Sequence, residues 1–230
     1  MIRIQNLCKV YRPSAGQEVH ALEDVSLNVE RGEFVAVVGA SGSGKTTLMN
    51  IIGCLDTPTV GEYSLDGTDV SRLNGAQLSK VRSEKISFVF QGFNLIPTLT
   101  ALENVELPLI YRGMDTAARR RLSVTALQSV GLEARAGHLP AELSGGQQQR
   151  VAIARALAAD APIILADEPC GNLDSKAGAA VMEMLHRLHK AGKTVVLITH
   201  DDKAALTADR QIRISDGKIV DMQASEEAGA

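Results

Sequence analysis

The stretch FVAVVGASGSGKTT, from Phe34 to Thr47, decides the fold class of this 230-residue chain. Its first five residues form an aliphatic run typical of a strand buried on both faces, and the segment LMNIIGCL that follows predicts a helix. The glycines between them let the backbone turn tightly and direct several N–H groups inward, beside the positive N-terminal end of the helix. This order of strand, turn and helix predicts a phosphate-binding loop.

The loop carries the residue types that a nucleoside triphosphate and its cation require. We expect Lys45 to reach the β- and γ-phosphates, Thr46 to ligate Mg²⁺ through its hydroxyl, and Thr47 to contact the α-phosphate. The whole loop is expected to surround the phosphates, and its members are Gly39, Ala40, Ser41, Gly42, Ser43, Gly44, Lys45, Thr46 and Thr47.

Three further aliphatic runs predict buried parallel strands, and helical patterns lie between them. They are ISFVF at 86–90, IILA at 163–166 and TVVLIT at 194–199. Segments near the N-terminus, at 62–67 and at 212–220 alternate polar and apolar residues, which predicts a half-exposed antiparallel sheet. The expected class is therefore α/β, mainly parallel, with an N-terminal antiparallel β subdomain.

Residues 1–222 are expected to form a single domain, and 223–230 a frayed tail of small and polar residues. No buried strand is predicted between Gly92 and Leu143. Two helices are predicted there instead, the first interrupted by Pro108. We therefore expect an inserted α-helical subdomain at about 92–146.

Composition and charge exclude several classes of protein. The net charge is −3 and there is no basic excess, so no nucleic-acid partner is expected; the run ARRRL at 118–122 is interpreted as a solvated helix face. The chain has three cysteines, Cys8, Cys54 and Cys170, and their spacing matches no zinc site. An odd number of cysteines favours reduced thiols in the cytosol. No segment has the roughly 18 apolar residues of a membrane span, so any membrane role should be peripheral.

Polar residues follow three of the buried strands. Asp167 and Glu168 end IILADE, Gln91 follows ISFVF, and His200 follows TVVLIT. Ligands of open α/β sheets bind beyond the carboxyl ends of the strands, so these side chains are expected beside the loop. Asp167 and Gln91 should help Thr46 to hold Mg²⁺. Glu168 should deprotonate the attacking water, with Gln91 contacting that water.

The segment LSGGQ at 143–147 opens a helix and resembles a second anion-binding site. Ser144 is a good N-cap, and Gly145 and Gly146 allow close backbone approach, with Gln147 completing the first turn. A γ-phosphate already held by Lys45 does not readily reach a second site on the inserted subdomain of the same chain. The simplest solution is a twofold pair in which each chain closes the nucleotide site of the other.

These motifs together resemble the ATP-binding cassette (ABC) proteins over nearly the full chain, which implies a P-loop NTPase fold with a RecA-like core and ATP hydrolysis. The resemblance implies that Tyr11, at the end of LCKVY, stacks on adenine, and that Asp174, in the turn GNLD, lies in a loop that acts across the dimer. It also implies that Lys45 and His200 take part in catalysis, His200 through a hydrogen bond to the γ-phosphate.

Longer segments, such as TTLMNIIGCLDTPTVGEYSLDG and FVFQGFNLIPTLTALENVELPLIYRG, are similar to the macrolide-export and lipoprotein-release branch of that family. This similarity implies an ATP-driven homodimer that powers a separate membrane permease, and hence a cytoplasmic protein held peripherally at the inner face of the membrane. The expected permease-contact strip is Phe93, Asn94, Leu95, Ile96, Pro97 and Thr98.

Two positions depart from the family pattern. Ala40 replaces a usual proline, which the loop should tolerate because its backbone does the binding. Cys170 replaces a usual threonine after DEP, and the alternatives are a neutral substitution or a redox-sensitive brake on hydrolysis.

The same motifs leave two other functions open besides the transport motor. The same dimer could act on a membrane partner in cell division or signalling, and the sequence barely separates this role from transport. A nucleic-acid cassette of the repair or translation type is disfavoured, because those proteins carry long insertions or paired cassettes with a charged linker.

Overall fold

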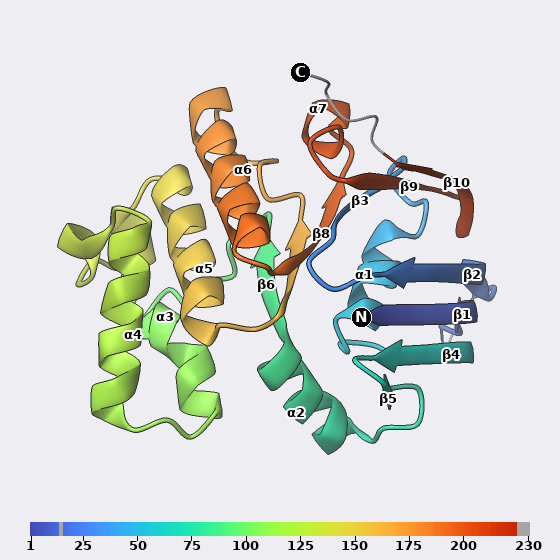
Figure 1. Ribbon diagram of the computed structural model, residues 1–230, viewed down its shortest axis with the longest axis horizontal. Helices are drawn as coiled ribbons and strands as arrows, with labels where there is room; N and C mark the ends of the chain where they lie inside the picture. The colour runs from blue at the N-terminus through green and yellow to red at the C-terminus, as the bar shows by residue number, and fades with distance from the viewer. Residues whose placement is uncertain (14–15, 225–230) are drawn as a thin grey trace.

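The computed structural model describes residues 1–13 and 16–224, and its main layer is a six-stranded sheet (Figure 1). The strand order is β10-β9-β3-β8-β7-β6, in which β9, β3, β8, β7 and β6 run parallel and β10 pairs antiparallel with β9. The strands are β3 (Phe34–Val38), β6 (Ile86–Phe90), β7 (Ile163–Asp167), β8 (Thr194–Thr199), β9 (Arg210–Ser215) and β10 (Lys218–Ala224). The α/β class and the four predicted parallel strands are confirmed.

Both faces of this sheet are buried, as a central parallel strand requires. Phe34, Ala36 and Val38 of β3 enter one hydrophobic core with the helices α5 (Gly145–Ala159) and α6 (Ser175–Lys190). Val35 and Val37 enter the other core with α1 (Lys45–Ile52). Figure 1 shows α1 between the main sheet and a second, antiparallel sheet.

The second sheet has the order β2-β1-β4-β5 and is antiparallel throughout. Its strands are β1 (Ile2–Tyr11), β2 (Val19–Val29), β4 (Val60–Leu65) and β5 (Thr68–Asp69). The predicted antiparallel subdomain is therefore present, but the segment 212–220 does not belong to it. That segment forms parts of β9 and β10 at the edge of the main sheet, where one side of each strand is also exposed.

The region between β6 and α5 is helical, as predicted. It contains α3 (Ala101–Tyr111), α4 (Thr116–Ser129) and the short 3-10 turns Glu133–Arg135 and Pro140–Glu142. The predicted interruption at Pro108 is wrong, because α3 continues through it. Burial of the α3 residues Leu102, Val105 and Leu109 offsets the local cost of proline, about 3 kcal/mol. The exact boundaries of the inserted subdomain stay a prediction.

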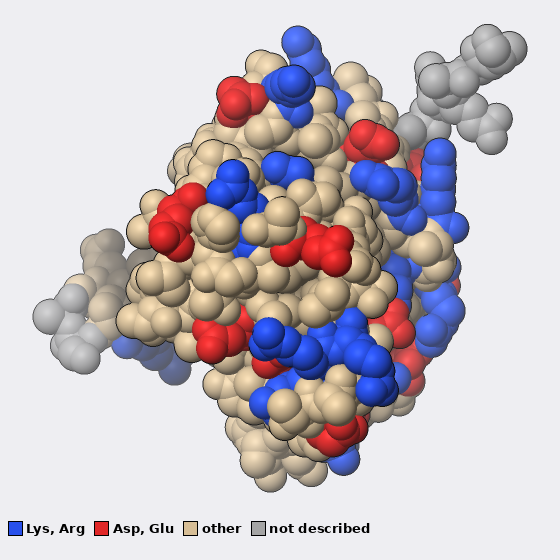
Figure 2. Space-filling view, turned by 90° about the vertical axis from the view of Figure 1, so that its left-hand side faces the viewer, with Lys and Arg blue, Asp and Glu red and all other residues tan. Residues whose placement is uncertain are grey.

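The arginine run at 118–122 lies on α4. Arg119 and Arg120 both approach the carboxylate of Glu106 on α3, at 3.4 and 3.7 Å. Figure 2 shows the side of the molecule that carries α4, where acidic side chains lie among the basic ones. The run therefore contributes to helix packing and to a surface of mixed charge.

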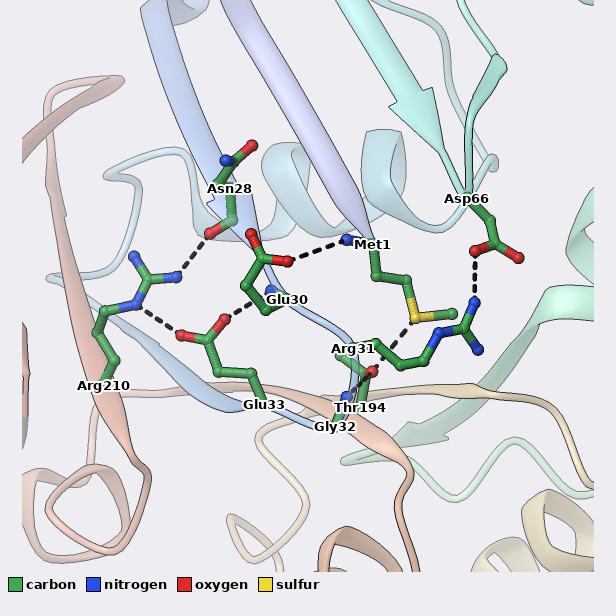
Figure 3. Close-up of polar contacts among 9 residues, drawn as sticks. All are labelled: Met1, Asn28, Glu30, Arg31, Gly32, Glu33, Asp66, Thr194 and Arg210. Carbon is green, nitrogen blue, oxygen red and sulfur yellow. Dashed lines mark hydrogen bonds and ion pairs between the residues drawn. The ribbon is translucent and has the colours of Figure 1, made fainter.

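Polar contacts join the two sheets at the amino-terminal ends of the parallel strands (Figure 3). Arg210 donates to Glu33 at 2.7 Å and to the Asn28 carbonyl at 2.6 Å. The Gly32 N–H donates to the hydroxyl of buried Thr194 at 2.9 Å. These contacts fix the turn between β2 and β3, at the edge of the sheet opposite the phosphate loop.

The remaining helices are α2 (Gly75–Lys85), which the sequence did not predict, and α7 (Asp202–Ala205). Strand β10 reaches Ala224, two residues into the predicted tail, and 225–230 lie outside the described residues. Within the described part of the chain, no helix combines the length and apolarity needed to cross a bilayer.

Candidate active site

Four parallel strands end level with one another and create the edge on which the site is built. Val38 is paired with Thr199, Asp167 with Ile198, and Phe90 with Asp167. The loop after β3, the acids after β7, His200 after β8 and Gln91 after β6 therefore share one edge of the sheet. This is the position where open α/β sheets bind ligands.

Two glycines of the loop are required by close backbone contacts. A Cβ on Gly39 would lie 2.2 Å from the Ile214 carbonyl oxygen. Gly44 has φ +107°, and a Cβ there would lie 2.7 Å from the Ala21 carbonyl oxygen. The loop between them, which contains Ala40, Ser41, Gly42 and Ser43, is thus held against β9 and β2 with its backbone close to both strands.

Lys45, Thr46 and Thr47 form the first turn of α1, directly after the loop. Lys45 is buried, and its ammonium donates to the carbonyls of Gly39 and Ala40 at 2.7 and 2.8 Å. The Ser43 hydroxyl is also buried and has no hydrogen-bond partner among the residues that the structure describes. An unsatisfied donor and a buried cation at one helix N-terminus fit an anionic ligand with several oxygens.

Two adjacent carboxylates, Asp167 at the end of β7 and Glu168 directly after it, place negative charge near Lys45. Burial raises the pKa of Asp167, the neighbouring Glu168 raises it further, and Lys45 partly opposes both effects. A carboxylate in such surroundings gains from a nearby cation. Asp167, together with the Thr46 hydroxyl, therefore fits a site for Mg²⁺, which prefers hard oxygen ligands.

Glu168 is held in a defined orientation by the end of β8. Its φ is +45°, a left-handed conformation that is uncommon outside glycine. Its N–H donates to the Ile198 carbonyl at 2.8 Å, and the Thr199 hydroxyl donates to its carboxylate at 3.3 Å. The Nδ1 atom of His200 lies 2.6 Å from the other carboxylate oxygen. A left-handed backbone conformation with a carboxylate held by two side chains indicates a functional position.

Gln91 lies at the same edge, but its side chain faces another partner. Its amide donates to the Asn172 side chain at 3.3 Å, and the Asn172 amide donates to the Gln91 carbonyl at 3.1 Å. A Cβ on Gly171 would lie 2.5 Å from the Gln91 side chain. Gln91 is therefore placed against the turn that contains Asp174, and its predicted Mg²⁺ contact stays a prediction.

The start of α5 lies beside that same turn. Ser144 is its N-cap, and a capping box joins Ser144 to Gln147. A Cβ on Gly145 would contact Phe93 and Leu173, and one on Gly146 would lie 3.0 Å from Ala177. Asp174 is the N-cap of α6, accepting from the Ala177 N–H at 2.8 Å. The two predicted cross-dimer elements, at Ser144 and Asp174, thus lie next to each other.

The strip from Phe93 to Thr98 is shaped by two polar side chains, the half-buried Arg155 and the buried Asn104. Arg155 of α5 donates to the carbonyls of Phe93 and Asn94 at 3.0 and 2.7 Å. Asn104 is fully buried, accepts from the Ile96 N–H at 2.7 Å and donates to its carbonyl at 3.1 Å. Asn94, Ile96, Pro97 and Thr98 are exposed, whereas Phe93 and Leu95 are half-buried.

Cys170 lies next to Glu168 and lines a cavity of about 360 Å³ with Glu168, His200, Met182 and Leu197. Burial, with smaller effects from Asp201 and Glu168, raises the pKa of its thiol to about 11. The thiol donates to the Gly178 carbonyl at 3.4 Å. A thiol that stays protonated at neutral pH is a weak nucleophile, which favours the neutral substitution over the redox brake.

Three residues hold side chains or loops of the site in place, and the sequence predicts a role for none of them. Thr199 donates to Glu168, Asn172 holds Gln91, and Arg155 holds the strip. Thr199 and Asn172 are polar residues beside predicted site residues, so position alone could have marked them. Arg155 gives no such signal, because it lies inside an otherwise ordinary helix.

Comparisons with known proteins agree with this geometry. A family model described as ABC transporter matches residues 22–171. The macrolide export ATP-binding/permease protein MacB of Brucella melitensis is 53% identical over 220 residues, which are 96% of this chain and 34% of that protein. The chain thus spans about a third of the length of its MacB relatives.

Two shorter relatives match over nearly their whole length. The uncharacterized ABC transporter ATP-binding protein MJ0796 of Methanocaldococcus jannaschii is 54% identical over 225 residues, 95% of each chain. Its counterpart YvrO of Bacillus subtilis is 49% identical over 220 residues, 96% of each chain. A solved dimeric, post-hydrolysis structure of MJ0796 bound to ADP and Pi has a TM-score of 0.91 and 48% identity, and covers 98% of this chain and 99% of that one.

Proposed function

Since this chain belongs to the ABC transporter family, of which it is an ATP-binding cassette, we propose that it hydrolyses ATP to drive a membrane permease through a nucleotide-dependent dimer. The observation that carries this proposal is the arrangement at the sheet edge. Lys45 and the unsatisfied Ser43 hydroxyl lie together where the loop enters α1, and Glu168 is oriented by Thr199 and His200. The MJ0796 structure with ADP and Pi supports the same chemistry.

The geometry of each side chain at this edge suits it to one step of ATP hydrolysis. Glu168 accepts a proton from the attacking water, a contribution of about 10²–10⁴-fold in rate. His200 bonds Glu168 through Nδ1, which leaves Nε2 for the γ-phosphate; a cationic ring donates through both nitrogens. When ATP binds, the Lys45 ammonium leaves the carbonyls of Gly39 and Ala40 and donates to phosphate oxygens instead. Thr46, Asp167 and Gln91 are the residues that would hold Mg²⁺, which would neutralise charge on the phosphates.

The second half of each site comes from the partner chain. Ser144 and the Gly145–Gly146 backbone present a capped helix start that packs on the Asp174 turn of its own chain, and Gln147 stabilises that cap. In a twofold pair, this helix start can bind the γ-phosphate held by the partner's loop. ATP then binds the closed pair better than the open one, and hydrolysis releases it.

The Ser144→Asp variant tests this shared site. Asp is as good an N-cap as Ser, so α5 should remain intact. The added charge faces the triphosphate of the partner, and like charges in contact cost several kcal/mol, which is about 100-fold or more in ATP-induced dimerisation. We expect ATP binding by the single chain to stay within about twofold of wild type, since P-loop contacts remain.

Both Ser144 variants are made in chains that also carry Glu168→Gln, so that hydrolysis does not open the pair. Gel filtration with ATP and Mg²⁺ then measures the mass, and calorimetry measures ATP binding by the single chain. Ser144→Asn, which keeps the cap without the charge, is the matched control and should still dimerise. A Ser144→Asp chain that loses its own ATP affinity while it stays folded would place Ser144 in a single-chain site and contradict the proposal.

The permease-docking surface is proposed to include the strip 93–98 and the groove beside it. This groove, about 1050 Å³, lies between α2, β6 and α3. Phe88 and Phe90 stack along it with ring centroids 5.3 Å apart, and Tyr111, 81% exposed, stands at its side. Exposed aromatic surface of this kind marks interaction sites. Docking there would hold the chain at the cytoplasmic face of the membrane.

Tyr111→Asp is expected to weaken docking at least tenfold, because it removes an aromatic contact and buries a charge. The measurement is co-sedimentation of the purified chain with inner-membrane vesicles from the source cells. ATP hydrolysis by the free chain should be unchanged, since Tyr111 lies outside the site. Tyr111→Phe should sediment as wild type does. Equal sedimentation of Tyr111→Asp would remove this groove from the docking surface.

A further inference from the structure

Tyr11, the last residue of β1, is connected to two charged side chains that the reaction does not use. Its hydroxyl donates to Asp56 at 2.9 Å. Asp56 also forms an ion pair with Lys9 at 2.6 Å, and the Lys9 ammonium donates to the Thr57 carbonyl at 2.8 Å. Lys9 is only 9% exposed although it is two residues from the end of a surface strand. A long cationic side chain is rarely buried without a specific partner.

Lys9 also occupies one face of the tyrosine ring. Its ammonium lies 4.8 Å from the ring centroid, a cation–π distance. The tyrosine as a whole is 37% exposed. One face is therefore covered by the cation, so a base that stacks on Tyr11 would use the opposite face.

The anchor of this arrangement is the segment that follows α1. The N–H groups of Leu55 and Asp56 both donate to the Asn50 carbonyl, at 2.8 and 3.2 Å. Asp56 is therefore fixed to the helix whose first turn carries Lys45 and Thr47. A hydrogen bond with the Thr47 side chain also affects the pKa of Tyr11, which burial and Asp56 together raise. The ring and the phosphate loop are thus attached to the same helix.

We propose that Lys9 and Asp56 are positioning residues that hold the Tyr11 ring in the orientation in which its free face stacks on the nucleotide base. This inference rests on the proposed role of Tyr11 in binding ATP. An untethered surface tyrosine loses rotamer freedom when a ligand orders it, whereas a tethered one is ordered in advance. Preorganisation of one such side chain corresponds to about three- to tenfold in affinity.

The test compares a ligand with a base and one without, using calorimetry with ADP and with pyrophosphate. Tyr11→Phe keeps the ring but loses the hydroxyl, and Asp56→Asn removes the charge that both partners need. Each is expected to weaken ADP binding about three- to tenfold and to leave pyrophosphate binding within twofold. The double variant should lose no more than the worse single one, because both changes break one tether.

Three comparisons decide the outcome. Tyr11→Ala must weaken ADP binding more than pyrophosphate binding; if it does not, the base site itself is wrongly placed. Suppose that Tyr11→Ala weakens ADP binding more than pyrophosphate binding, while Tyr11→Phe and Asp56→Asn bind ADP as wild type does. The base then stacks on Tyr11, but the proposed positioning by Lys9 and Asp56 is wrong. Equal loss of ADP and pyrophosphate in Asp56→Asn would indicate damage to the loop and also overturn it. Asp69→Asn, an exposed acid paired with Arg72, is the matched control.

Discussion

The Glu168→Gln variant is expected to hydrolyse ATP about 10²–10⁴-fold more slowly than wild type while binding it normally. Gln has nearly the same shape, so it can keep a hydrogen bond with Thr199 and one with His200. It cannot accept a proton from water. Because hydrolysis is the step proposed to open the pair, we also expect ATP and Mg²⁺ to trap the variant as a dimer.

Phosphate release measures the rate, and gel filtration with ATP measures the mass, which should double. Glu183→Gln is the matched control, an exposed acid on α6 that approaches Arg187 at 3.9 Å. It should hydrolyse ATP at the wild-type rate and open again. A Glu168→Gln chain that turns over normally would assign the proton to another group, and a persistent monomer would count against the dimer mechanism.

The Lys45→Ala variant is expected to lose ATP affinity rather than only rate. Removing the buried ammonium that pairs with the phosphates is expected to weaken the free energy of ATP binding by about 3 kcal/mol. This corresponds to about 100-fold in the dissociation constant. Hydrolysis should fall by a further 10²–10³-fold, roughly the cost of removing one preorganised donor from a transition state. The fold should survive, because the ammonium bonds only carbonyls of its own loop.

Calorimetry with ATP and a phosphate-release assay measure the two effects separately, and thermal unfolding of the nucleotide-free chain checks the fold. Lys193→Ala is the control for a lost lysine. That residue pairs with Asp160 at the opposite edge of the sheet and should change neither quantity by more than about twofold. Wild-type affinity in a folded Lys45→Ala chain would show that the backbone alone holds the phosphates.

The strand ends could be predicted from the sequence because buried parallel strands are continuous aliphatic runs that stop at polar residues. The strand β2 could not, since its apolar positions are irregular and bulges shift its pairing with β1. Helix α2 buries only Leu78, so it has no apolar stripe to recognise.

Alternation at 212–220 correctly indicated half-exposed strands. It could not tell which sheet they join, because edge strands of either sheet alternate in the same way. The contact between Gln91 and Asn172 joins residues 81 apart in the chain, and only the tertiary structure brings them together. The tether at Tyr11 has the same origin, since Asp56 lies 45 residues away.

The two hydrogen bonds of Arg155 have a mechanical consequence. They join α5, whose first residues are proposed to close the nucleotide site of the opposing chain, to the loop that is proposed to contact a permease. A guanidinium bonded to two adjacent carbonyls resists both sliding and rotation of one segment over the other. If a permease docks at Phe93 and Asn94 as proposed, a displacement of this loop is passed through Arg155 directly to the helix that begins at the proposed shared nucleotide site.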